Sequence, residues 1–248
     1  MNLDLERDLT GQVALVAGTD FAVDLVIAQA LAARGATVVW GSNARFDGGP
    51  ASGPAPWLAA GIHPLNCEPF CHESVASLIE HTKRQFGPID ILVHHLADPA
   101  SGAWDTRPGW SASTVLMVSS AFLLTLLVAM SSMLPRQRGR IICVTSPWDP
   151  VGQDALALQV CRDGYRAIAD SCRRLASEWA DSGVSVNHVS VDAVVGGTGR
   201  APGAAEATVW PTNGWSLADA VTLFGSCRGV GLTGHTVSAH IEAGASWH

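Results

Sequence analysis

The sequence predicts an α/β fold in which one doubly wound parallel β-sheet carries helices on both faces. Short apolar runs alternate with longer segments whose apolar residues recur at helical spacing. The short runs are apolar throughout, which is typical of parallel strands that are buried on both faces. Right-handed crossovers between such strands produce a doubly wound sheet. We expect residues 1–248 to form a single domain, because this length suits one α/β core.

Each expected element is bounded by residues that favour its ends. The first helix ends before Gly35, and the fourth strand is entered through Gly87 and Pro88. Strands are expected at Gln12–Ala17, Thr37–Trp40, Ile62–Leu65, Ile89–His94, Arg140–Thr145, Val184–Val191 and Thr236–Ile241. Helices are expected at Val23–Arg34, Glu73–Phe86, Ser111–Leu134, Gln153–Asp181 and Leu217–Ser226. A loop rich in glycine, alanine and proline, residues 192–214, is expected to act as a substrate lid.

Composition excludes several classes of function. The net charge of −7 gives no electrostatic basis for binding nucleic acid or an anionic membrane. Cys67 and Cys71 lack a second ligand pair at metal spacing, so no metal site is expected. Residues 1–11 are acidic and contain no apolar stretch, which predicts a cytoplasmic protein without a signal peptide.

The segment 109–135 carries no charged residue and is long enough to cross a membrane. Serine and threonine residues interrupt it, and it stands within the βα alternation. We therefore expect a helix of the core or of a subunit interface, with no membrane partner.

Several segments that lead into strands carry a family likeness. They are Phe86–Val93, Gly139–Ile142, Val184–Asn187 and Leu232–His235. Together with the order of elements, they resemble the short-chain dehydrogenase/reductase superfamily over almost the whole chain. The resemblance implies a Rossmann-like fold.

The same resemblance extends to the catalytic stretch, but one residue differs. In the family the fifth strand ends in serine, and the next helix carries Tyr-x-x-x-Lys. Here Ser146 ends the strand, Arg162 takes the lysine position, and Leu158 stands where the tyrosine belongs. Because leucine can neither give nor take a proton, the resemblance implies an atypical site with Ser146 and Arg162 as its catalytic pair.

The glycine-rich turn that holds the family's cofactor also differs. Gly18 is kept, whereas Ala22 and Asp24 occupy the second and third glycine positions. Asp24 would put a carboxylate at the start of the helix, where it repels a phosphate. His94 and His95 replace the family's Asn-Asn after the fourth strand. We therefore expect no cofactor and disfavour NAD(P)H.

These differences favour an enzyme that acts without a redox cofactor. The Ser146 and Arg162 pair resembles that of halohydrin dehalogenases, so we expect a lyase, isomerase, cyclase or dehalogenase-like step. One alternative is a non-catalytic, ligand-binding pseudoenzyme. Another is an atypical NAD(P)H-dependent oxidoreductase in which a different group donates the proton.

Candidates for an acid or base lie near the expected site. His94 and His95 can titrate near neutral pH, and Tyr165 lies one helical turn from Arg162. Asp192 follows the sixth expected strand. We name all four as possible proton carriers.

Nine tryptophans stand against one tyrosine. Several fall on or beside loops that follow strands, and with Leu158 they are expected to line the substrate pocket: Trp104, Trp148, Trp210 and Trp215. Indole rings there predict a hydrophobic or aromatic substrate. The two long helices at Ser111–Leu134 and around Arg162 resemble the family's interface helices, so we expect a homo-oligomer, either a dimer or a tetramer.

Overall fold

The computed structural model describes residues 7–18, 20–42, 61–68, 71–96, 110–146, 155–195, 215–229 and 231–242. These residues form one parallel sheet of eight strands in the order β3-β2-β1-β4-β5-β6-β8-β7. The strands are β1 (Val13–Ala17), β2 (Thr37–Ser42), β3 (Ile62–Asn66), β4 (Ile91–Leu96), β5 (Gly139–Thr145), β6 (Val184–Val195), β7 (Trp215–Ser216) and β8 (Thr236–Glu242). The order reverses at β1 and β4, which confirms the predicted doubly wound α/β fold.

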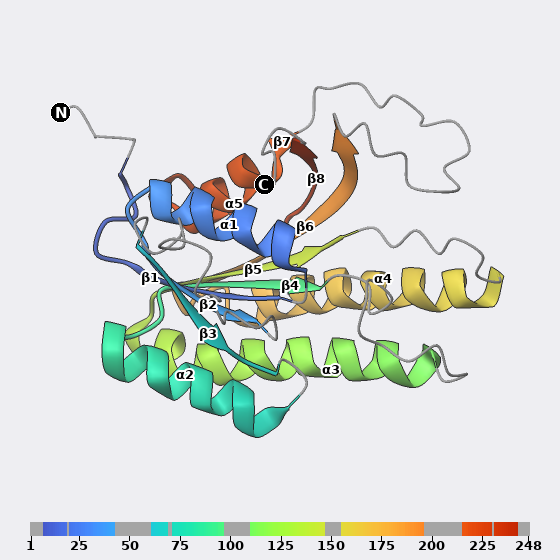
Figure 1. Cartoon of the computed structure of the whole chain (residues 1–248), viewed down its shortest axis with the longest axis horizontal. Coiled ribbons are helices and arrows are strands. Elements are labelled where there is room, and N and C mark those ends of the chain that lie inside the picture. The colour runs from blue at the N-terminus through green and yellow to red at the C-terminus, as the bar shows by residue number, and fades with distance from the viewer. Residues whose placement is uncertain are drawn as a thin grey trace, which may run out of the picture.

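Helices cover both faces of the sheet (Figure 1). One face carries α1 (Phe21–Ala33) and α5 (Leu217–Gly225), which pack against each other. The other face carries α2 (His72–Phe86), α3 (Trp110–Val128) and α4 (Ala155–Glu178). Each layer has its own apolar core, and Trp40 is fully buried in the α1/α5 layer.

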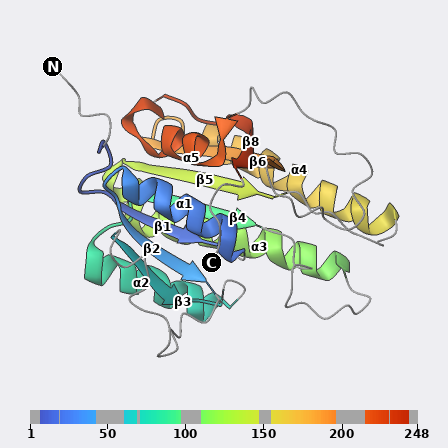
Figure 2. The same cartoon turned by 45° about the horizontal axis from the view of Figure 1, so that its top comes forward.

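The expected uncharged helix is α3, and it continues through a π-helical turn (Ala129–Met133) and a 3-10 turn (Leu134–Arg136). In the described part of the chain, Ser119–Arg136 is long and apolar enough to cross a membrane by length and composition alone. Core helices of soluble proteins meet the same criteria, and this one lies alongside α4 in both views (Figures 1 and 2).

Some element boundaries differ from the predicted ones. β4 extends to Leu96, so His94 and His95 lie inside the strand and their side chains point to opposite faces. β6 runs to Val195, so residues 192–195 of the predicted lid belong to a strand, and residues 196–214 lie outside the described residues. The short edge strand β7 was not predicted, because two residues leave no periodicity to detect.

Candidate active site

Three polar side chains from three elements meet at the carboxyl edge of the sheet. Asp24 comes from the first turn of α1, His95 from β4, and Ser146 directly follows β5. His95 Nδ1 lies 2.6 Å from Asp24 Oδ1, and His95 Nε2 lies 2.7 Å from Ser146 Oγ. The two hydrogen bonds make a continuous chain, which we call the Asp24–His95–Ser146 chain.

Strand alternation explains why His95 takes part and His94 does not. Ile91 and Val93 belong to the α1/α5 core, whereas Leu92 belongs to the core under α2, α3 and α4. By this alternation His95 faces α1 and His94 faces the opposite layer. Burial is the main cause that lowers the pKa of His94 to about 4, followed by the charge of His95, while a hydrogen bond to the Ala121 backbone opposes both. His94 is therefore a neutral residue of the opposite layer near pH 7.

Asp24 points inward rather than toward solvent. Its side chain is fully buried, and its carboxylate packs on Gly18, where a Cβ atom would lie 2.1 Å from Asp24 Oδ1. Burial raises the pKa of Asp24, while the charge and hydrogen bond of His95 lower it. A residue without a side chain at position 18 is what leaves room for this carboxylate.

The start of α1 is capped by a second carboxylate. Asp20 Oδ1 accepts a hydrogen bond from the Val23 N–H at 3.1 Å, and the Asp20 carbonyl oxygen accepts one from the Asp24 N–H at 3.0 Å. Asp20 is partly exposed. It therefore stands where a helix N-terminus would otherwise attract an anion.

Ser146 is the member of the chain that a ligand can reach. Its side chain is partly exposed, whereas His95 and Asp24 have no exposed surface. The Ser146 N–H donates to the Leu96 carbonyl oxygen at 3.2 Å, which fixes the end of β5 against β4. The hydroxyl group is thus held by His95 on one side and open on the other.

The remaining predicted residues are placed less fully. Arg162 and Leu158 lie on α4 and Ala22 lies on α1, but their side chains are outside the described part of the structure. Asp192 is the extra residue of a β-bulge in β6, and its side chain is also undescribed. The predicted pocket residues Trp104, Trp148 and Trp210 lie outside the described residues altogether.

Two predicted residues are described and lie apart from the Asp24–His95–Ser146 chain. Tyr165 is partly buried and packs against the core under α2, α3 and α4. Trp215 is 49% exposed on the edge strand β7, which β6 and β8 separate from β5. The predicted tryptophan pocket therefore stays a prediction.

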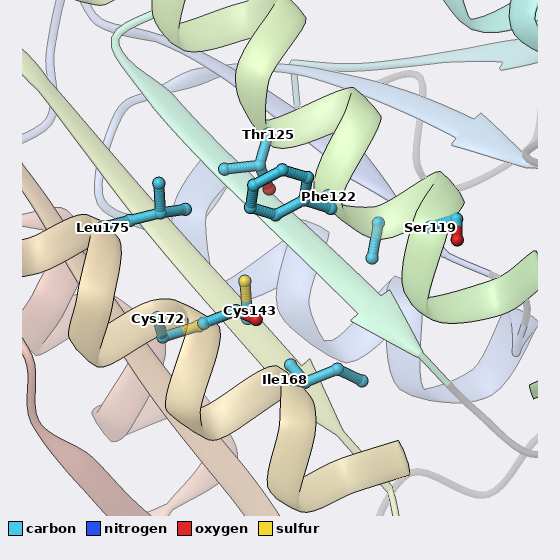
Figure 3. Close-up of a pocket in the computed structure, with 9 residues that line it drawn as sticks. Ser119, Phe122, Thr125, Cys143, Ile168, Cys172 and Leu175 are labelled. Atoms are coloured by element: carbon cyan, nitrogen blue, oxygen red, sulfur yellow. The ribbon is translucent and has the colours of Figure 1, made fainter. Parts of the chain in front are cut away.

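A cavity of about 260 Å³ lies elsewhere, between α3 and α4 (Figure 3). Phe122 lines it from α3, Leu175 and Cys172 line it from α4, and Cys143 of β5 lies at its base. Cys143 belongs to the core under α2, α3 and α4, whereas His95 points to the other face. This cavity is therefore separate from the Asp24–His95–Ser146 chain. Contact with Cys143 is the main cause that raises the pKa of the Cys172 thiol, and burial adds to it.

No metal-binding group of histidine, cysteine and acidic residues occurs in the described part of the chain. The described cysteines, Cys67, Cys71, Cys143 and Cys172, are all free thiols.

The strand order defines a doubly wound α/β protein. Proteins of this class bind their ligands at the carboxyl edge of the sheet, which is where Ser146 lies. Residues 25–208 match the family described as Enoyl-(Acyl carrier protein) reductase. The 3-oxoacyl-[acyl-carrier-protein] reductase FabG of Escherichia coli (strain K12) is 30% identical over 183 residues, which cover 73% of this chain and 72% of that protein. The chain belongs to the short-chain dehydrogenase/reductase superfamily.

Other known proteins are similar in sequence or in fold. The D-beta-hydroxybutyrate dehydrogenase of Cupriavidus necator is 28% identical over 185 residues, covering 73% of this chain and 70% of that protein. The structure of NADPH-Dependent 3-Quinuclidinone Reductase from Rhodotorula Rubra superposes with a TM-score of 0.68 at 18% identity, covering 95% of this chain and 92% of that one. The likeness to the quinuclidinone reductase structure supports the assigned fold.

These comparisons overturn the expectation of an enzyme that lacks a redox cofactor. The sequence relatives are named as a reductase and a dehydrogenase, and membership of this family indicates an oxidoreductase with a nicotinamide cofactor. A lyase, isomerase, cyclase or dehalogenase-like step is therefore the wrong main function for this chain. The sequence relatives also support an enzyme rather than a pseudoenzyme.

The direction of the Asp24 side chain is the physical reason for the correction. A carboxylate at the third glycine position was expected to face the cofactor's phosphates and repel them. The structure instead turns this carboxylate beneath the helix, where His95 binds it. Asp24 therefore no longer counts against a dinucleotide at this turn.

Proposed function

We propose that the chain is a nicotinamide-dependent oxidoreductase that interconverts a carbonyl compound and its secondary alcohol. Family membership supports the reaction class, and Ser146 supports the location of the site. Its hydroxyl group lies at the carboxyl edge of the sheet, directly after β5. The strand order reverses between β1 and β4, and β5 is the neighbour of β4. The names of the two sequence relatives favour a 3-oxoacyl compound or a 3-hydroxy acid as substrate.

The first turn of the fold fits the pyrophosphate of such a cofactor. Gly18 and the N-terminal turn of α1 would hold it, because a helix N-terminus attracts phosphate. The inward position of Asp24 leaves the partly exposed Asp20 as the described carboxylate at this turn. When bound, the nicotinamide supplies or accepts a hydride.

Ser146 would bind the substrate oxygen. A hydroxyl group held by His95 at 2.7 Å keeps a defined orientation, so it can donate a hydrogen bond to a carbonyl oxygen. We retain Arg162 on α4 as a second proposed contact. Leu158 cannot carry a proton, so the proton must come from another group.

Cofactor binding and turnover test this function together. Tryptophan fluorescence of the wild-type protein should transfer energy to NADPH or NADH on titration. The same cofactor should be oxidised when ethyl acetoacetate is added, or NAD(P)+ reduced when 3-hydroxybutyrate is added. Absence of binding by either cofactor at millimolar concentration would contradict the proposal.

The Asp20→Asn variant should bind NADPH about 2- to 5-fold more tightly, since a carboxylate near a helix N-terminus shifts anion binding by up to about 1 kcal/mol. Asparagine caps a helix as well as aspartate does, so α1 should keep its first turn. Titration by energy transfer measures the effect, and added salt should reduce it. Glu80→Gln, at an exposed carboxylate on α2, is the control and should leave the affinity unchanged. Equal affinities of Asp20→Asn and wild type would show that Asp20 does not face the phosphates.

The chain is further proposed to be a cytoplasmic homo-oligomer, a dimer or tetramer. Phe122 and Met130, on α3 and its π-helical continuation, are large apolar residues that are 41% and 66% exposed. Helices α3 and α4 lie side by side, so they form one surface that a second copy can cover. Light scattering should give a mass above that of the monomer.

A further inference from the structure

Reduction of a carbonyl group needs a proton as well as a hydride, and the family's tyrosine position holds Leu158. We propose that the Asp24–His95–Ser146 chain is a proton relay that delivers this proton to the substrate oxygen. The inference rests on the proposed oxidoreductase function. It assigns Ser146 as the catalytic residue that contacts substrate, with His95 and Asp24 as residues that act through it.

The relay balances in each direction. In reduction, a hydride would bond to the carbonyl carbon, and the electron pair of the C=O π bond would move to the substrate oxygen. The Ser146 O–H bond breaks as its proton passes to that oxygen. The proton on His95 Nε2 then moves to Ser146 Oγ, and the imidazolium becomes neutral imidazole. In oxidation the same protons move the opposite way, and a bound oxidised nicotinamide would accept the hydride from the carbinol carbon.

Burial makes Ser146 the route by which a ligand reaches His95. Asp24 and His95 have no exposed surface, and Ser146 is partly exposed. A buried carboxylate 2.6 Å from Nδ1 fixes the orientation of the ring and the tautomer that presents Nε2 to Ser146. The hydroxyl group at 2.7 Å from Nε2 then lies in line for transfer.

The surroundings of His95 contain few other titratable groups among the described residues. Asp24 contacts it from α1, and Asp20 acts on Asp24 from the start of the same helix. His94 is next to it in β4, but faces the other layer and is neutral near pH 7. The Trp40 side chain of β2 acts to lower the pKa of Asp24, against the larger effect of burial. Asp24 is therefore the acidic side chain that contacts His95.

The backbone around Ser146 favours a proton relay over a serine nucleophile. A nucleophilic serine needs backbone N–H groups that hold an oxyanion. The Ser146 N–H already donates to the Leu96 carbonyl oxygen, and the next residue is Pro147, which has no N–H. The described residues thus provide the base and its orienting carboxylate without that oxyanion site.

The test uses the full-length protein with NADPH and ethyl acetoacetate, and four variants. His95→Gln and His95→Asn remove the imidazole, and asparagine is the residue that the resembled family has there. Asp24→Asn removes the charge. His188→Asn is the matched control, because His188 is also a buried histidine in a strand, β6, and its Nε2 lies 3.0 Å from a hydroxyl group, that of Thr145. His188 does not belong to the Asp24–His95–Ser146 chain. The readouts are kcat, the solvent deuterium isotope effect and the Kd of NADPH.

We expect the His95 variants to lower kcat by about 100-fold, as loss of a general acid does. Both His95 variants should lose the solvent isotope effect of the wild-type protein, but keep the Kd of NADPH. Asp24→Asn should also lower kcat, because a neutral amide is a weaker hydrogen-bond acceptor for the ring N–H than a carboxylate. His188→Asn should resemble wild type.

Two failures can be told apart. If wild type neither binds nor oxidises NADPH, the oxidoreductase function is wrong and the relay falls with it. If wild type is active and a folded His95 variant keeps the wild-type kcat and solvent isotope effect, the relay alone is wrong. Nitrogen-15 spectra give a readout without cofactor: wild type should show a proton on His95 Nδ1 whose signal shifts in Asp24→Asn. An unchanged signal would also overturn the relay.

Discussion

Ser146→Ala is expected to lower kcat/KM for carbonyl reduction by about 10²- to 10³-fold, as the loss of a hydrogen-bond donor to the reacting oxygen does. Ser146 is the partly exposed member of the Asp24–His95–Ser146 chain. Removal of its hydroxyl group therefore takes away both the substrate contact and the last step of proton transfer. The Kd of NADPH should stay the same, because no cofactor contact is assigned to this hydroxyl group. Steady-state rates and energy-transfer titrations give the two numbers.

The control for Ser146 is Ser171→Ala. The Ser171 hydroxyl is exposed on α4 and donates to the Ala167 carbonyl oxygen within its own helix. Its loss should leave kcat/KM unchanged. A folded Ser146→Ala protein with wild-type kcat/KM would remove Ser146 from the active site.

Gly18→Ala should lower the free energy of unfolding by about 2–4 kcal/mol, the sum of an overpacked contact and a broken buried hydrogen bond. The new Cβ atom would lie 2.1 Å from Asp24 Oδ1. The carboxylate cannot move away and keep its 2.6 Å contact with His95. Urea unfolding followed by circular dichroism measures the change.

A double-mutant cycle isolates this contact. In an Asp24→Gly background the space above residue 18 is empty, so Gly18→Ala should cost less than about 1 kcal/mol there. The same cost in both backgrounds would mean that Asp24 does not pack on Gly18.

The fold was predictable because strand burial leaves a direct record in the sequence. Runs such as Ile141–Val144 are apolar at every position, which only a strand covered on both faces requires. The same property hides the direction of individual side chains. In β4 the neighbours of His94 and His95 are apolar on both faces, so the sequence does not show which histidine faces α1.

The inward position of Asp24 was not predictable for a similar reason. α1 is apolar on nearly all sides, so its sequence contains no single stripe that fixes which residues face the sheet. The aspartate was therefore interpreted as a charge at the helix start, with its usual exposed position. The sequence did contain one signal for this site. Asp24, His95 and Ser146 each lie at the carboxyl end of a predicted strand or beyond it, and a parallel sheet brings these ends to the same edge.

The site itself was predicted in part. Ser146 and His95 were both named as candidates, and the structure joins them through one hydrogen bond. Asp24 was named as a degenerate cofactor position, and the structure places it as the partner of His95. The roles of Arg162, Leu158 and Asp192 stay predictions, because their side chains lie outside the described part of the structure.

Transfer of deuterium from NADPH labelled at the reactive nicotinamide carbon tests the central claim most directly. Wild-type protein incubated with labelled cofactor and a 3-oxoacyl thioester should yield a 3-hydroxyacyl product with deuterium on the carbinol carbon, detected by mass spectrometry. Ethyl acetoacetate and cyclohexanone extend the test to other carbonyl compounds. A folded wild-type protein that leaves the label on the cofactor with all of these substrates would contradict the claim.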